Sequence, residues 1–211
     1  MRTDDLIQAL VADRTSREGP VARRLAVMVA IGVLVSLALY AAILAPRDLA
    51  AAVLMPRFAF KLAVTLLLAA GAAPLLTRLA RPDGVPGILA LGLLLAPLLL
   101  AVGIGIELIV LDPSEWRVRL VGDNAVACLL CIPLLSLPVL TATLTALRHG
   151  APTRPRFAGV VAGLFAGGLG AFLYATHCPD DSPLFVAAWY PLAIAAVVAM
   201  GCVLANRVLR W

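Results

Sequence analysis

The segment from residue 157 to residue 205 decides the fold, because it places a short polar island between two long apolar runs. It reads FAGVVAGLFAGGLGAFLYAT for residues 157–176, HCPDDSP for residues 177–183 and LFVAAWYPLAIAAVVAMGCVLA for residues 184–205. Each apolar run lacks charged residues and has about 20 residues, the length that an α-helix needs to cross a bilayer. The segment therefore predicts two transmembrane helices joined by an exposed loop at a membrane surface. That loop carries a thiol and an imidazole.

The whole chain has the composition of an integral membrane protein. Apolar residues make up 63% and charged residues 14%, and the mean hydropathy is +1.02, whereas soluble domains have roughly 45–50% apolar and 25% charged residues. The net charge of +5 does not indicate nucleic-acid binding, because the basic residues lie almost wholly between apolar runs, where they orient helices.

Further apolar segments extend this pattern, so the sequence predicts an all-α integral membrane protein with six transmembrane helices in one domain, residues 25–211. The connections are short, and we expect helices adjacent in sequence to pack as antiparallel neighbours. In the fifth span Gly159, Gly163 and Gly167 recur every four residues, which predicts a face for close helix packing. The predicted spans are Leu25–Leu44, Phe58–Leu76, Val85–Leu111, Ala125–Leu147, Phe157–Thr176 and Leu184–Ala205.

The distribution of basic residues predicts that both termini lie in the cytoplasm. With the N-terminus inside, twelve of the seventeen Lys and Arg residues fall in cytoplasmic segments, as the positive-inside rule requires. The polar island then faces the periplasm of a Gram-negative bacterium. We expect a multi-pass protein of the inner membrane, with the lipid bilayer as its surroundings.

Residues 1–24 are polar and contain a predicted short amphipathic helix. A threonine can cap this helix, two acids in its first turn suit the positive end of the helix dipole, and its apolar side chains form one stripe. Two interpretations stay open on these residues alone: a helix that lies on the lipid surface, and a docking peptide for a soluble partner. The residues concerned are Thr3, Asp4, Asp5, Leu6, Ile7, Leu10 and Val11.

Two charged residues, Lys61 and Glu107, lie within the second and third predicted spans, both near the periplasmic end. A charge inside a membrane is costly, so each is a candidate functional residue. The two can form one intramembrane ion pair. Alternatively, Lys61 extends to the interface and Glu107 is exposed by a helix shorter than predicted.

Three of the four cysteines lie near the predicted periplasmic surface. Cys128 and Cys131 are in the first turns of the fourth span and Cys178 is in the polar island, whereas Cys202 lies at the other end of the sixth span and is predicted to be a packing residue. Cys178 can meet Cys128 across the bundle, where the pair could be oxidised, reduced or bound transiently by a soft metal ion, with His177 as an auxiliary ligand. The alternative is that these cysteines are apolar packing residues.

The sequence Cys128-Leu-Leu-Cys131 is formally a CxxC motif, which suggests a membrane thiol–disulfide oxidoreductase as an alternative function. Such enzymes relay electrons between two dithiols, and only Cys178 is left on that face for a second pair. The sequence contains no Walker, Rossmann or zinc-protease pattern. We therefore expect a protein that is not an enzyme and has no cofactor.

Three segments, together with the six-helix layout, resemble the NrsF family, negative regulators of a bacterial extracytoplasmic-function sigma factor. They are MRTDDLIQALVAD at residues 1–13, YATHCPDDSPLFVAAWY at residues 174–190 and LRW at residues 209–211. The resemblance covers essentially the whole chain. It implies an inner-membrane anti-sigma factor that holds its sigma factor inactive and releases it under heavy-metal stress such as chromate or cadmium.

The resemblance also implies roles for particular residues. The family needs two cysteines for its response, and by position these correspond to Cys178, in its HCP context, and to Cys128, from the C-L-L-x-I-P spacing ahead of Pro133. Cys131 stays open as the alternative partner of Cys178. Residues 1–24 become the sigma-binding segment.

Overall fold

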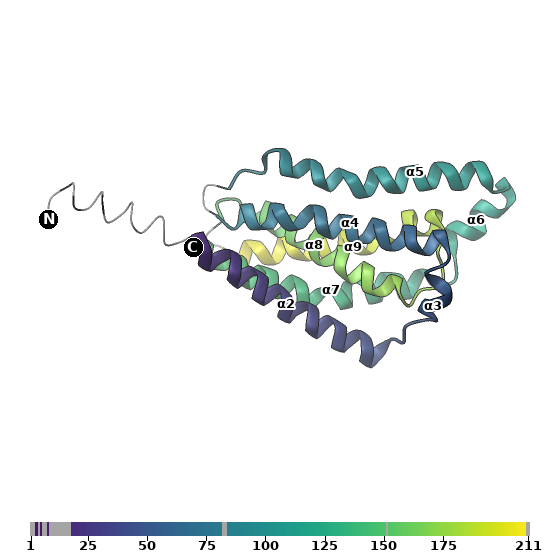
Figure 1. Cartoon of the computed structure of the whole chain (residues 1–211), viewed down its shortest axis with the longest axis horizontal. Coiled ribbons are helices and arrows are strands. Elements are labelled where there is room, and N and C mark those ends of the chain that lie inside the picture. Colours follow the sequence, from purple (N-terminus) through teal and green to yellow (C-terminus); the bar gives the residue numbers. More distant parts are fainter. Residues whose placement is uncertain are drawn as a thin grey trace.

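The computed structural model describes residues 18–81, 84–150 and 152–209, together with Thr3, Asp5 and Gln8. All regular structure in this part of the chain is helical, without a strand (Figure 1). The elements are α2 (Glu18–Ile43), α3 (Leu49–Ala52), α4 (Pro56–Leu79), the 3₁₀-helix η1 (Gly87–Leu94), α5 (Leu95–Val110), α6 (Pro113–Val121), α7 (Ala125–Arg148), α8 (Pro155–Ala175) and α9 (Pro183–Val208).

Six of the helical segments are long and apolar enough to cross a membrane, in agreement with the six predicted spans. They cover Ala22–Ile43, Pro56–Leu79, Gly87–Val110, Ala125–Arg148, Pro155–Ala175 and Pro183–Val208. The third span differs from the prediction in its geometry, because it opens as the 3₁₀-helix η1 and becomes α-helical only at Leu95. The short helices α3 and α6 in the connections were not predicted.

Proline and side-chain caps set the beginnings of several helices. A proline at the first helical position lacks the N–H that would have no partner there, and its fixed φ angle suits the helix. The side chains of Asp112 and Ser182 accept hydrogen bonds from backbone N–H groups in the first turns of α6 and α9. The prolines at helix starts are Pro56, Pro113, Pro155 and Pro183.

Helix α8 lies at the centre of the bundle and packs against α4, α7 and α9 (Figure 1). Its glycines allow these close approaches. A Cβ atom at Gly163 would lie 2.5 Å from the Cα of Val198 in α9, and one at Gly168 would lie 2.9 Å from the backbone nitrogen of Ala69 in α4. The predicted glycine face is therefore confirmed, and it is directed at α9. Other glycines of α8 extend close packing to further neighbours.

The expectation that consecutive long helices are neighbours holds for α4 with α5, for α7 with α8 and for α8 with α9, but it is wrong for α2 with α4 and for α5 with α7, since α5 packs against α4 and α9. Helix α2 packs against α7 instead of α4. Gly32 of α2 meets the backbone of α7 at Pro138 and Val139, and the buried Ser36 hydroxyl donates a hydrogen bond of 2.8 Å to the Leu135 carbonyl. The connection through α3 is long enough to carry the chain across to α4.

Two buried clusters form the core, one toward each end of the bundle. The first contains Leu25, Leu79, Leu147 and Leu209, from the start of α2 and the ends of α4, α7 and α9. The second lies beside the connection between α8 and α9. It contains aromatic residues and two cysteines, among them Tyr40, Cys128, Tyr174, Cys178, Phe185 and Tyr190.

We expect Gly163→Val to destabilise the protein by about 2 kcal/mol, because a valine side chain at this position has no room between α8 and α9. The measurement is thermal unfolding of the purified protein in detergent. Gly105→Val is the matched control, since a Cβ atom at Gly105 in α5 meets nothing within 4 Å. Equal unfolding temperatures for the two variants would contradict the packing argument.

Candidate functional site: the loop between α8 and α9

The candidate site is built on the α8–α9 loop, residues 176–182, which contains most of the polar island of the sequence. Its side chains and backbone carbonyls contact α4, α5, the α2–α3 connection and the start of α7. The loop thus joins elements that are far apart in the chain. The strongest of these contacts neutralise charged groups that are buried or partly buried.

The central contact is made by Lys61 of α4, whose side chain is completely buried. Its Nζ atom forms an ion pair with Asp181 Oδ1 at 2.6 Å. It also donates hydrogen bonds to the carbonyl oxygens of Cys178, at 2.8 Å, and Asp180, at 3.2 Å. A buried ammonium group is tolerated only when it is paired and hydrogen-bonded. All three acceptors come from one loop, so Lys61 fastens that loop to α4.

The α2–α3 connection supplies a second anchor. Arg47 Nη2 lies 2.7 Å from Asp181 Oδ2, so the Asp181 carboxylate sits between two cations. His177 Nδ1 lies 2.6 Å from the Ala45 carbonyl oxygen. Because a carbonyl oxygen can only accept, Nδ1 carries the proton and donates it.

The start of α7 supplies a third anchor. Asp180 Oδ2 accepts hydrogen bonds from the backbone nitrogens of Asn124, at 3.0 Å, and Asp123, at 3.2 Å, and from Asn124 Nδ2, at 3.0 Å. A carboxylate is stabilised at this position by the free N–H groups and the positive end of the helix dipole. Cys128 lies in the first turns of the same helix.

Glu107 of α5 is buried and belongs to a separate pair. Its Oε2 lies 3.1 Å from an Arg57 guanidinium nitrogen, and its Oε1 accepts a hydrogen bond of 3.0 Å from the Ser182 hydroxyl. The predicted Lys61–Glu107 ion pair is therefore wrong, and so is the alternative in which Lys61 extends to the interface and Glu107 is exposed. The charged partner of Lys61 is Asp181 in the α8–α9 loop, and the charged partner of Glu107 is Arg57 at the start of α4.

The structure brings Cys128 and Cys178 into one buried cluster, and both are free thiols with no exposed surface. The expectation of an exposed loop is thus wrong for the thiol itself, because Cys178 points into the core. Burial raises the pKa of the Cys178 thiol, and the nearby Lys61 ammonium group offsets part of that rise. The neutral thiol therefore prevails at neutral pH. Cys131 and Cys202 are free and partly exposed.

Two aromatic hydroxyl groups share this cluster. The rings of Tyr174 and Tyr190 lie 6.3 Å apart, and the Tyr190 hydroxyl is buried without a hydrogen-bond partner. Among the described residues, no group of three or more His, Cys, Asp and Glu side chains is arranged to hold a metal ion. A soft metal ion would have to rearrange the site before the two thiols and His177 could bind it.

The sequence-predicted residues of the N-terminal segment are only partly described. Thr3 and Asp5 are helical and exposed. The remaining ones, Asp4, Leu6, Ile7, Leu10 and Val11, lie outside the described residues.

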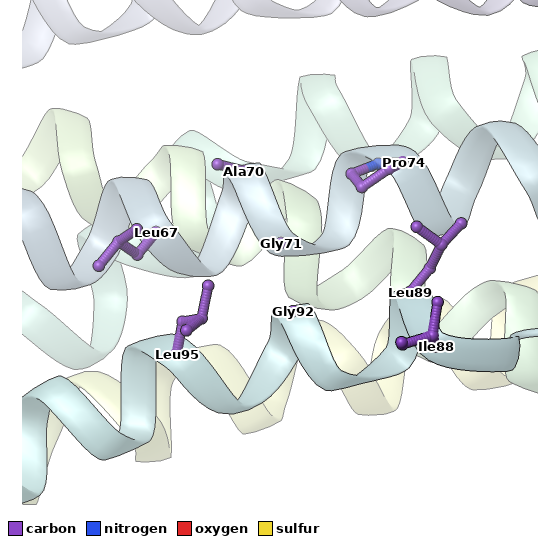
Figure 2. Close-up of a pocket in the computed structure, with 8 residues that line it drawn as sticks. All are labelled: Leu67, Ala70, Gly71, Pro74, Ile88, Leu89, Gly92 and Leu95. Carbon is purple, nitrogen blue, oxygen red and sulfur yellow. The ribbon is translucent and has the colours of Figure 1, made fainter.

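An apolar groove of about 370 Å³ lies between α4 and the η1–α5 span (Figure 2). Gly71 of α4 faces Gly92 of η1 there, and the absence of side chains lets the two backbones approach closely. The lining residues are leucine, isoleucine, alanine, glycine and proline. They offer no group that could act as an acid, a base or a nucleophile.

Comparison with known proteins identifies the relatives of this chain. The family model described as "NrsF: Negative regulator of sigma F" matches residues 10–211. The chain belongs to the NrsF family. It is 38% identical over 217 residues to the "Probable anti-sigma-F factor NrsF" of Azospira oryzae and 37% identical over 221 residues to the "Anti-sigma-F factor NrsF" of Caulobacter vibrioides, and each alignment covers 100% of both chains. No solved structure matches.

Membership of the NrsF family confirms the resemblance found in the sequence. The family's description as a negative regulator implies a regulatory, non-enzymatic role. It therefore disfavours the thiol–disulfide oxidoreductase suggested by Cys128 and Cys131.

Sequence reasoning identified Lys61, Glu107 and Cys178, but it missed Asp181 and Arg47 as partners of the buried charge. A signal was present, since the sequence places two adjacent acids in the loop between two segments of membrane length and a lysine within another such segment. Acids in a surface loop are usually solvated, so this signal alone did not distinguish Asp181.

We expect the two ends of the Lys61–Asp181 pair to differ in their effect on stability. Asp181→Asn leaves a buried ammonium group without a carboxylate and is expected to cost roughly 3 kcal/mol. Lys61→Met is expected to cost less, because Asp181 keeps Arg47. The double variant Lys61→Met/Asp181→Asn is expected to recover part of the Asp181→Asn loss.

Thermal unfolding in detergent measures these differences. Glu115→Gln is the control, because the Glu115–Arg119 pair is exposed and exposed pairs contribute little. An Asp181→Asn protein as stable as the Lys61→Met protein would show that Lys61 does not depend on this carboxylate.

Proposed function

We propose that this protein is a membrane-bound anti-sigma factor that holds an extracytoplasmic-function sigma factor inactive at the cytoplasmic face of the bacterial inner membrane. The observation that carries this proposal is the NrsF family match over residues 10–211, together with full-length similarity to proteins named anti-sigma-F factors. The six helices of membrane length support the location in a bilayer.

The charge at the two ends of the bundle supports the proposed orientation. Basic residues flank the starts or ends of α2, α4, α7, α8 and α9 at the end of the bundle where the first core cluster lies. The positive-inside rule assigns such an end to the cytoplasm. The α8–α9 loop, at the other end, then faces the periplasm. The basic residues concerned are Arg23, Arg24, Arg78, Arg81, Arg148, Arg154, Arg156 and Arg207.

Residues 1–24 are the proposed sigma-binding segment. This segment leads into α2 at the basic end of the bundle, and its sequence has the apolar stripe of a helix that docks on a protein groove. The connections at residues 78–83 and 148–156, which begin at the C-terminal ends of α4 and α7, complete the proposed contact surface.

Cys128 and Cys178 are the proposed sensor of heavy-metal or oxidative stress. Soft metal ions bind thiolates, and binding displaces the thiol protons even where burial raises the pKa. A buried thiol has no room for an added group, so reaction at Cys178 must displace the α8–α9 loop. That loop contacts α4 and the start of α7, and both helices extend to the proposed sigma-binding end. A signal can release the sigma factor only if the two arrangements of these helices bind it with different affinity.

The sigma-binding proposal predicts the effect of charges on the N-terminal apolar stripe. Leu6→Glu/Leu10→Glu is expected to reduce the sigma factor retained in a pull-down at least roughly tenfold, because two apolar anchors of a docked helix are lost. The measurement is co-purification of the sigma factor with the full-length, detergent-solubilised protein. Gln8→Glu, on an exposed position of the same segment, is the control. Wild-type retention by the double variant would exclude this segment as the docking element.

The sensor proposal predicts that a Cys178→Ser strain no longer induces the sigma-dependent genes on exposure to chromate or cadmium, because serine cannot form the thiolate that binds or is oxidised. A reporter fused to a sigma-dependent promoter measures the response. Cys202→Ser, in α9, is the control and is expected to respond normally. Separate Cys128→Ser and Cys131→Ser strains determine which thiol works with Cys178. Full induction in the Cys178→Ser strain would exclude the cysteine mechanism.

A further inference from the structure

The completely buried Lys61 side chain makes a direct contact with the backbone of Cys178. Lys61 Nζ donates to the Cys178 carbonyl at 2.8 Å and to the Asp180 carbonyl at 3.2 Å, and it forms the 2.6 Å ion pair with Asp181. Within the described part of the chain, Arg47 acts on the Asp181 carboxylate, the start of α7 on the Asp180 carboxylate and Glu107 on the Ser182 hydroxyl, and none of these contacts involves the Cys178 carbonyl.

We propose that Lys61 is a positioning residue for Cys178: its ammonium group holds the backbone of residues 178–181 closed over the buried thiol, so that reagents reach this thiol only when the Lys61 contacts open. The inference deepens the proposed function and rests on it, since it concerns the regulation of the proposed sensor cysteine. Lys61 does not react itself.

The energetics of burial explain why one residue can control access. The Cys178 thiol has no exposed surface, so its reaction needs a local opening of the loop. Hydrogen bonds to a charged donor are stronger than those between neutral groups. Opening the loop would also leave a buried ammonium group without its partners. Lys61 therefore keeps the open population small in the resting protein.

The same contacts connect the thiol to α4. When the loop opens, Lys61 loses the acceptors that neutralise it, and the position of α4 in the bundle is no longer held by this pair. Helix α4 ends at Leu79, which belongs to the core cluster at the opposite end of the bundle. Lys61 thus provides a physical connection between the state of Cys178 and a helix that reaches the proposed sigma-binding end.

The rate at which N-ethylmaleimide labels Cys178 in the full-length protein in detergent tests the proposal. Chymotryptic peptides analysed by mass spectrometry resolve Cys178 from Cys202. Lys61→Met is expected to label at Cys178 roughly tenfold faster than the wild type, with Cys202 unchanged, because the loss of charged hydrogen bonds raises the open population by about that factor.

If Lys61 acted on Cys178 only through its charge, Lys61→Met would label more slowly at Cys178 than the wild type. The Lys61 ammonium group lowers the pKa of Cys178, so its removal alone leaves less thiolate and slows labelling. Arg119→Met is the control, because the Arg119–Glu115 pair is exposed and makes no contact with the Cys178 backbone among the interactions of the described residues. It is expected to label at the wild-type rate.

Unchanged or slower labelling of Cys178 in Lys61→Met would overturn the proposal. A parallel increase at Cys202 would also overturn it, because this indicates general loosening of the bundle. If Lys61→Met does not yield folded protein, Lys61→Met/Asp181→Asn, which also lacks the ammonium group, is judged by the same two criteria.

The labelling rate tests the positioning role of Lys61 whether or not Cys178 is the sensor. Faster labelling in Lys61→Met together with normal induction in a Cys178→Ser strain would retain the positioning role of Lys61 and reject the sensor. Unchanged labelling in Lys61→Met together with lost induction in a Cys178→Ser strain would reject the positioning role of Lys61 and retain the sensor.

Discussion

The ammonium group of Lys61 lies in the interior of a protein made mainly of apolar helices, and the arrangement around the α8–α9 loop depends on its neutralisation. Its ion pair and both of its hydrogen bonds join α4 to a loop more than a hundred positions away in the sequence. Arg47 then shares the Asp181 carboxylate, and Asp180 is held by the start of α7. Removing the carboxylate partner of a buried ammonium group costs far more than the pair contributes, so the position of Lys61 depends on the loop staying in place.

The packing of α8 makes this arrangement possible. Glycines on several sides of α8 allow α4, α7 and α9 to approach its backbone, and the close van der Waals packing that results stabilises the bundle. Because α8 is surrounded, its C-terminal loop emerges among the ends of its neighbours. The loop therefore contacts several helices at once and can respond to all of them.

The burial of Cys128 and Cys178 limits how fast either thiol can react, and any signalling mechanism that uses them has to include an opening of the structure. A thiol without exposed surface, held protonated by its surroundings, reacts slowly with ions or oxidants until the structure opens. The proposed sensor role requires such a low resting reactivity, because a sensor has to stay silent in the absence of stress. The position of the thiols within a packed cluster also means that a bound ion or a new bond changes helix packing directly.

The sequence by itself determined the helical class, the six segments of membrane length, the glycine face of α8 and the family, because helix length, residue periodicity and local motifs are properties of contiguous residues. It also singled out Lys61, Glu107 and Cys178 by residue type and position. Only the tertiary structure decided that Lys61 pairs with Asp181, that Glu107 pairs with Arg57, that α2 packs against α7 and that Cys178 faces inward. Each of these depends on which distant segments meet. A buried charged group pairs with the partner that helix packing brings within reach, and this need not be the residue predicted to lie at the same depth in a neighbouring span.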